Sequence, residues 1–400
     1  MQRAGPMGVL FSYAFRPFFI LTTVYAIIVV PYWTSAWLGY LPVPTWLGTP
    51  SWWHAHEMIY GFAGGAIGGF ALTAVATWTR RPPVAGVPLL ISSAFWLLAR
   101  VLFALPFSAL HWAALLSDLT YGVMLFALMS REVIAARNGR NYKVLLILGL
   151  LPISNALFFF GVIRRLSWTG AALTAGLWLV VLLVTLIAGR IVPAFTRNWL
   201  KMHGGPERST TERLPPAFDW FDRLTVTLMV GFAVADLGIG SSPWLAPWAL
   251  LTSALLVVRL ARWQGYRTLG EPLVWVLHLG FAWLPVGFAL LGLSEVNLVP
   301  RSAGLHAFTS GAITTMIVAV AGRAALGHTN RPLRSHRMLT ASYVLITISA
   351  VCRIIATFGV SVWLAVSAAA WCLGFISFAL RYLPILTQPA PSKPRTLPVM

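Results

Sequence analysis

The sequence predicts an all-α polytopic membrane protein with about twelve transmembrane helices. Of its 400 residues, 58% are apolar and only 10% are charged, whereas about a quarter of the residues of a soluble protein carry charge. Apolar runs of 18 or more residues recur along the chain, and each is long enough to cross about 30 Å of hydrocarbon. The positions of the basic residues between these runs then predict the orientation of the bundle.

All but five of the 29 lysines and arginines fall at the span ends that share a side with both termini. The five on the opposite side are Arg100, Arg164, Arg165, Arg301 and Arg353. Because cytoplasmic loops carry the excess of basic residues, we expect both termini to be cytoplasmic. The net charge of +19 is therefore a topology signal, and we expect no nucleic-acid partner.

Twelve apolar runs give the expected spans: 18–38, 57–78, 86–105, 110–130, 143–163, 170–190, 222–240, 244–263, 270–293, 302–325, 338–357 and 361–382. No small-residue cleavage site follows the first run, so we interpret it as a retained helix and not as a signal peptide. The spans form one predicted membrane domain, 1–388. The polar loop 194–221 is the best position for a boundary between two halves, and the Pro-rich segment 389–400 is expected to be a disordered cytoplasmic tail.

The first two spans carry the most distinctive chemistry. Arg16 precedes a proline suited to a first helical turn and either lies at the interface or reaches an anionic group. The second span opens with Trp53-His54-Ala55-His56-Glu57-Met58 and continues through several glycines. Such small residues allow close helix packing or leave room for a bulky ring.

The middle spans offer fewer polar residues. Asp118, inside 110–130, is either a proton or polar relay or the ion-pair partner of Arg100, because an intramembrane acid is costly. The span 170–190 ends before Pro193, where Arg190 could pair with an acidic cofactor group. His278, inside 270–293, needs a polar partner or a metal.

An offset of 250 residues relates the second span to the tenth. It pairs His56 with His306, Gly61 with Gly311, and Thr79-x-Arg81-Pro82 with Thr329-x-Arg331-Pro332. We therefore expect two parallel helices that each hold one histidine at the same depth, an arrangement suited to a flat cofactor or a metal. The offset does not map the second span onto the eighth, so a simple six-plus-six duplication is not supported.

Imidazoles in this arrangement point to haem iron or copper. No Cys-x-x-Cys-His is present, so a haem would be bound non-covalently, as haem b. His54 and His56 lie about 200° apart on a regular helix. They therefore serve two centres, or meet at one if His54 lies in the cap before the first turn. Hydrogen-bonded structural histidines remain the alternative, and His328 is a further candidate at the cytoplasmic boundary.

Five motifs together resemble the NnrS family. They are Phe15-Arg16-Pro17-Phe18-Phe19; Trp53-His54-Ala55-His56-Glu57-Met58; Gly189-Arg190 with Pro193 and Phe195-Thr196-Arg197-Asn198; Leu277-His278-Leu279 with Trp283-Leu284-Pro285; and Leu305-His306-Ala307 with Arg323 and Ala325-Leu326-Gly327-His328-Thr329. The resemblance implies a bacterial inner-membrane protein that contains haem and copper and helps bacteria withstand nitric oxide and nitrosative stress.

Two positions depart from the family pattern. Members often read Asn-Trp-Thr-Gly where this chain has Thr77-Trp78-Thr79-Arg80, and many carry a histidine in the fifth helix where this chain has Phe158-Phe159-Phe160. If that histidine is a ligand in relatives, one centre is altered here. A looser likeness to the catalytic subunit of haem–copper oxidases covers one cofactor at most, because the histidines of helices 6 and 7 are missing, and it is analogy only.

These observations lead to one main hypothesis. His56 and His306 would be axial haem ligands, and His54 would bind copper, with His278 as a second ligand. Arg16, Arg190 and Arg323 would pair with propionates or other anions. The protein would bind or redox-convert nitric oxide or a nitrosyl species; as an enzyme it would be an oxidoreductase, with a quinol or a redox protein as electron donor. If both axial sites are filled, copper would be the reactive centre or the haem only an electron relay.

The main rival is a secondary transporter of a small solute, which would also have twelve spans and Gly/Pro-interrupted helices but no redox cofactor. A cofactor-free membrane scaffold is a third reading, and it leaves the histidine cluster unexplained.

Overall fold

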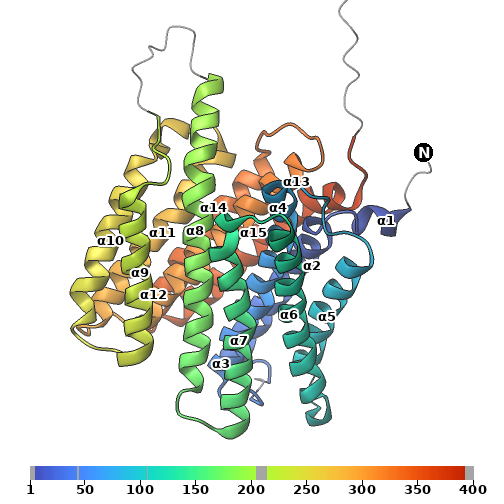
Figure 1. Ribbon diagram of the computed structural model, residues 1–400. Helices are drawn as coiled ribbons and strands as arrows, with labels where there is room; N and C mark the ends of the chain where they lie inside the picture. The colour runs from blue at the N-terminus through green and yellow to red at the C-terminus, as the bar shows by residue number, and fades with distance from the viewer. Residues whose placement is uncertain (1–4, 43–44, 106, 204–213, 392–400) are drawn as a thin grey trace, which may run out of the picture.

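The computed structural model describes residues 5–42, 45–105, 107–203 and 214–391, and all of its regular secondary structure is helical. Figure 1 shows long helices standing side by side in one bundle. The first half contains α1 (Pro6–Leu10), α2 (Phe15–Trp37), α3 (Pro50–His56), η1 (Glu57–Ala63), α4 (Gly64–Thr79), α5 (Val87–Ala104), η2 (Ser108–Leu110), α6 (His111–Ala135), η3 (Gly139–Asn141), α7 (Tyr142–Arg164) and α8 (Thr169–His203). The second half contains α9 (Trp220–Ile239), α10 (Leu245–Arg262), η4 (Gly265–Thr268), α11 (Pro272–Ser294), α12 (Arg301–His306), η5 (Ala307–Ile313), α13 (Thr314–Gly327), α14 (Arg337–Ala356) and α15 (Ser361–Thr387).

The predicted all-α polytopic class is confirmed. Within the described residues, 11 helices are long and apolar enough to cross a membrane. The segments α3–η1–α4 and α12–η5–α13 each count as one continuous span. The seventh predicted span, 222–240, corresponds to α9, which carries Asp222, Arg223 and Asp236 and is not among the 11.

Two helices are longer than predicted. The second span begins at Pro50, where the Thr49 hydroxyl accepts a hydrogen bond from the Trp52 backbone N–H at 3.3 Å, so the histidine motif lies within a 30-residue helix and not at its opening. The sixth span does not end near Arg190. Helix α8 continues through Pro193 to His203, because buried Thr196 and Leu200 pack its last turns into the protein and offset the roughly 3 kcal/mol that an interior proline costs.

The predicted half boundary and tail fall partly outside the described residues. Residues 194–203 of the expected loop are helical, and 204–213 and 392–400 are not described. The two ends of the bundle domain meet, because Arg16 at the start of α2 donates to the carbonyl oxygens of Leu386 and Gln388 at the end of α15, at 2.7 and 2.8 Å. The membrane orientation stays a prediction.

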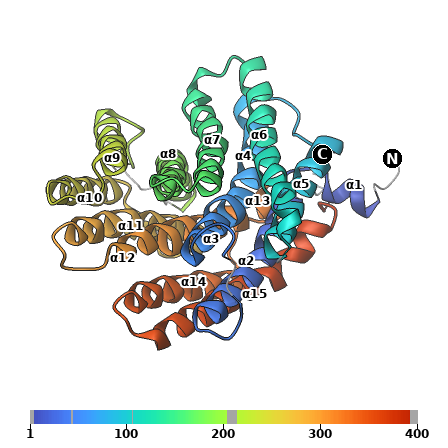
Figure 2. The same cartoon turned by 90° about the horizontal axis from the view of Figure 1, so that it is seen from below.

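Three elements form the centre of the bundle. Figure 2 shows α8, α4 and α13 within the outer arc of helices that runs through α5, α6 and α7, and α14 and α15 covering one face beside α2. The spans α3–η1–α4 and α12–η5–α13 are largely buried, and both contact α8. The site therefore has to be sought between these elements.

The 250-residue offset is reproduced by the backbone. Each segment has an α-helical turn that ends at a histidine, then a π-helix, then an α-helix, and the π-helices span 57–63 and 307–313. The ends correspond as well. The hydroxyls of Thr79 and Thr329 donate to the carbonyl four residues earlier, at 2.7 and 2.6 Å. The two segments are structural counterparts, and π-helical turns are rare and frequently lie at functional sites.

Candidate functional site: a histidine-lined cavity

A cavity of about 780 Å³ lies between α2, α3, α8, α12, η5, α14 and α15. This volume falls in the range of small-molecule and cofactor sites, roughly 300–1,000 Å³. Its walls are mainly apolar, with Trp33, Leu177 and Trp371 among them, and it reaches exposed residues at the helix ends, such as Trp37 and Gly359. Three basic side chains line it: His54, His306 and Arg353.

His54 reaches the cavity from α3. Its ring stacks on the indole of Trp33, with the ring centroids 4.6 Å apart and an interplanar angle of 8°. Its buried Nδ1 has no hydrogen-bond partner among the described residues. His54 also interacts electrostatically with His306 and Arg353, so the three side chains share one environment. An oriented imidazole without a partner is a fitting metal ligand.

His306 is the last residue of α12 and faces the same cavity. Its Nδ1 lies 2.7 Å from the carbonyl oxygen of Ser302, one helical turn earlier. A carbonyl only accepts, so Nδ1 carries the proton and the lone pair is on Nε2. Metal-binding histidines are commonly oriented in this way by a bond from the other ring nitrogen.

Arg353 lies on α14 and was not among the predicted site residues. It has no ion-pair or hydrogen-bond partner within the described part of the chain. An unpaired guanidinium in a membrane span is expensive, which indicates an anionic ligand for the cavity. The signal in the sequence was its position as the single charge in the predicted span 338–357.

His56 points to the other side of its helix, into a buried charge cluster formed by Tyr25, His56, Glu57, Arg100, Asp118 and Asn155. Its Nδ1 lies 2.9 Å from a Glu57 carboxylate oxygen, and its Nε2 lies 3.1 Å from Asn155 Oδ1 and 3.2 Å from Asp118 Oδ2. The Asn155 amide nitrogen donates to Asp118 at 2.6 Å, so its oxygen accepts. Both ring nitrogens of His56 therefore donate, and a doubly protonated imidazole has no lone pair for a metal.

Arg100 completes the cluster. It donates to Glu57 at 2.8 Å and pairs with Asp118, so the ion-pair alternative for Asp118 is the one that the structure shows. Tyr25 donates its hydroxyl to Glu57. The two carboxylates are balanced by Arg100 and the His56 imidazolium, which makes the cluster neutral overall and tolerable in a buried site.

The structure therefore brings His54, and not His56, into one cavity with His306. The two histidines of the motif face opposite sides, as the helical spacing predicts. Phe158 and Phe159 pack on the His56 ring, with centroids 5.6 and 5.1 Å away. An apolar wall thus covers the side of His56 that the charged groups leave open.

His278 and His328 lie elsewhere. His278 Nε2 is 2.8 Å from the Thr196 hydroxyl. Thr196 follows the cavity residue Leu177 on α8 by nineteen positions, roughly 28 Å at the rise of an α-helix, so His278 and His54 do not meet. His328 follows α13, its ring stacks on that of Phe15 with centroids 5.6 Å apart, and burial lowers its pKa.

The three predicted arginines have protein partners away from the cavity. Arg16 closes the end of α15 through the two carbonyls given above. Arg190 donates to Asn141 Oδ1 at 2.6 Å and to the Arg140 carbonyl at 2.9 Å. The Arg323 guanidinium lies 3.8 Å above the ring of Phe195. The cation that lines the cavity is Arg353 instead.

The cavity residues fit one of the two predicted cofactors. Two imidazoles, an apolar wall and a free guanidinium suit a non-covalent haem with its iron and its propionates. Copper has less support from the described residues. Within the described ranges, no group of three or more His, Cys, Asp or Glu side chains is placed to hold a metal ion.

Comparison with known proteins agrees with these features. A search of the curated proteins found no match to the chain. The family described as NnrS protein matches residues 9–390, a range that includes every long helix, the cavity and the charge cluster. The chain therefore belongs to the NnrS family.

Proposed function

We propose that this protein would bind haem in the cavity, held by His54 and His306, and that the haem would act as an electron relay in the conversion of nitric oxide or a related nitrosyl species. Family membership fits a nitric-oxide-related role. The observation that supports the site best is that His54 and His306 line one cavity, and that Arg353 lines the same cavity without a partner among the described residues. Neither the buried Nδ1 of His54 nor Nε2 of His306 has a hydrogen-bond partner in that part of the chain.

Each residue has a distinct part in this proposal. The Ser302 carbonyl and the Trp33 indole hold the two imidazoles in position. Arg353 would pair with a propionate, which would supply the anion that an intramembrane arginine requires. Haem held by two imidazoles supplies one-electron redox chemistry. No step is assigned to copper.

The setting follows from the fold and the family. The protein is a multi-pass membrane protein, and we place it in the bacterial inner membrane with both termini cytoplasmic. A quinol or a redox protein would supply the electrons, and the outcome would be protection from nitrosative stress.

A transporter is the second candidate, and one observation favours it. Two counterpart helices are interrupted near the cavity by π-helical turns, and broken helices around a substrate site are typical of secondary transporters. With Arg353 in the cavity, such a transporter would carry an anionic solute.

The absorption spectrum of the detergent-purified protein separates the two candidates. We expect a Soret band that shifts on reduction, and an electron paramagnetic resonance spectrum of low-spin ferric haem. His54→Ala and His306→Ala should each lose the low-spin signal, and Arg353→Gln should retain haem less tightly. His278→Ala and His328→Ala are matched controls that should keep the wild-type spectrum. A colourless protein that takes up an anion after haem supplementation would establish the transporter instead.

A further inference from the structure

An apolar crevice opens about halfway along the bundle, where α4, α8 and α13 meet. Its volume is about 70 Å³. Its walls contain buried residues such as Ile67, Ile187 and Met316, and half-exposed apolar residues such as Phe70 and Val320. Every residue of the lining is apolar. The crevice therefore offers no polar group to a ligand, and its apolar opening suits contact with the lipid hydrocarbon.

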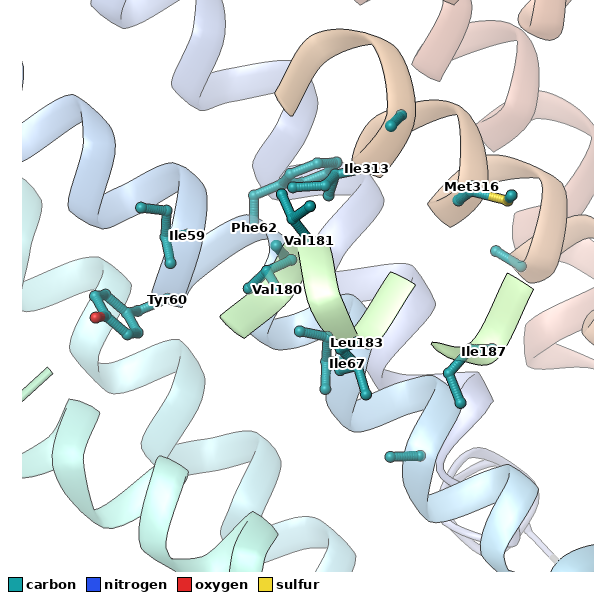
Figure 3. Packing of buried hydrophobic residues seen from close by; sticks show 14 of the residues in the cluster. Ile59, Tyr60, Phe62, Ile67, Val180, Val181, Leu183, Ile187, Ile313 and Met316 are labelled. Atoms are coloured by element: carbon teal, nitrogen blue, oxygen red, sulfur yellow. The ribbon is translucent and has the colours of Figure 1, made fainter. Parts of the chain in front are cut away.

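A smaller cavity of about 10 Å³ lies between this crevice and the histidine-lined cavity. It shares Ile313 with the crevice, and Met58, Ile59 and Thr309 with the histidine-lined cavity. Phe62 and Val180 also line it, and Figure 3 shows them gathered with Ile313 between η1, α8 and η5. The three spaces thus form a series.

The two threonines of the small cavity do not make it polar. The Thr309 hydroxyl donates to the Leu305 carbonyl, and the Thr314 hydroxyl donates to the Thr309 carbonyl, each at 2.9 Å. With these hydroxyls satisfied by the backbone, the crevice and the small cavity offer no free donor or acceptor to a solute. Water, which needs two or more polar partners in a buried site, is disfavoured there.

We propose that this series is a passage by which a small apolar gas enters the histidine-lined cavity from the hydrocarbon. The volume of the small cavity excludes a lipid chain or a ring compound, and apolar cavities accept small apolar guests. Apolar gases also concentrate in hydrocarbon relative to water. The inference rests on the proposed function for the identity of the guest, an apolar diatomic such as nitric oxide, but the passage itself can be tested without haem.

Xenon is the probe for the passage. Crystals of the purified protein under xenon pressure should show xenon in the crevice and in the small cavity. Val180→Phe should remove xenon from the small cavity, and Ile313→Ala should increase it. Leu182→Phe introduces the same side chain two residues away on α8, at a half-exposed position outside all three spaces, and should leave xenon in place. Absence of xenon from both spaces in the wild type would overturn the passage.

Stopped-flow mixing of the reduced holoprotein with dissolved nitric oxide gives the second readout. Val180→Phe should slow the spectral change roughly tenfold, as a modest added barrier does, while Ile313→Ala should speed it and Leu182→Phe should match the wild type. Equal rates in all four proteins would contradict the passage. If the Soret band were intact in these proteins, the haem site would still be supported. Bound xenon in a protein without haem would uphold the passage and remove the proposed function.

Discussion

The segments 50–82 and 301–332 share one backbone but not one environment. Both run from an α-helical turn through a π-helix into an α-helix, with bounds that differ by 250. Yet the first reaches the cavity with His54 and buries His56 among charges, whereas the second reaches it with His306, the counterpart of His56. A repeat of this kind predicts the path of the chain, and the neighbouring helices decide which side chain is used.

Packing explains the choice in the second segment. The counterpart of His54 is Gly304, where an added Cβ would lie 2.8 Å from Leu291 Cγ and 3.0 Å from the Gly287 carbonyl oxygen. No imidazole fits there. At the counterpart of Glu57 the second segment has Ala307, which is fully buried and apolar, so no charge cluster forms around His306 and its imidazole stays available.

The largest expected effect tests the charged side of the first segment. Arg100→Ala leaves the buried Glu57 and Asp118 carboxylates without their main cation, and breaking a buried ion pair in this way costs about 3–5 kcal/mol. We expect a large fall in the thermal unfolding temperature in detergent, or loss of folded protein. Arg164→Ala, an exposed arginine at a helix end, is the control. A stable Arg100→Ala protein would show that the cluster does not hold the first segment.

A smaller effect tests the apolar side of the second segment. Gly304→Ala pushes a methyl group against Leu291 and the Gly287 backbone, and overpacking of this kind costs about 1–3 kcal/mol. Gly64→Ala is the matched change in the first segment, because its Cβ would meet only ordinary contacts at 3.7 and 3.9 Å. Thermal unfolding should separate the two variants. Equal stability would mean that packing on α11 does not explain the absence of a side chain at 304.

The smallest effect comes from an ion pair outside both segments, which gives a baseline for the buried cluster. Asp219 begins α9, and its hydrogen bond with Arg262 lowers its pKa to about 2. A carboxyl group with a depressed pKa stabilises the fold at pH values above the ordinary carboxyl range, and this stabilisation is lost as the pH falls toward 2. Because the pair is partly exposed, Asp219→Asn should cost about 1 kcal/mol or less at neutral pH. Unfolding curves of the wild type and of Asp219→Asn at pH 7 and pH 3 measure this contribution. A loss of stability well above about 1 kcal/mol at pH 7 would contradict the prediction.

The sequence was sufficient for the spans, and it named both histidines of the cavity as candidate ligands. Apolar length and basic span ends located twelve helices within a few residues of their observed bounds, with α8 and α3 as the exceptions, because packing of Thr196 and capping by Thr49 extend them. His54 and His306 were both candidates. Their pairing was not predictable, because it depends on which face of the helix meets the cavity, and that is set by tertiary contacts. Arg353 was visible as a lone charge, but its freedom from partners appears only in three dimensions.

The π-helices give the two segments an unusual sensitivity to chain length. Each residue advances an α-helix by about 100°, so removing one residue from 57–63 would turn everything before it by that angle relative to α4. His54 would then turn away from the cavity, and His56 would lose its contacts with Asp118 and Asn155. Insertions and deletions in these seven residues, more than substitutions, are therefore the changes by which such a protein would gain or lose the proposed haem site.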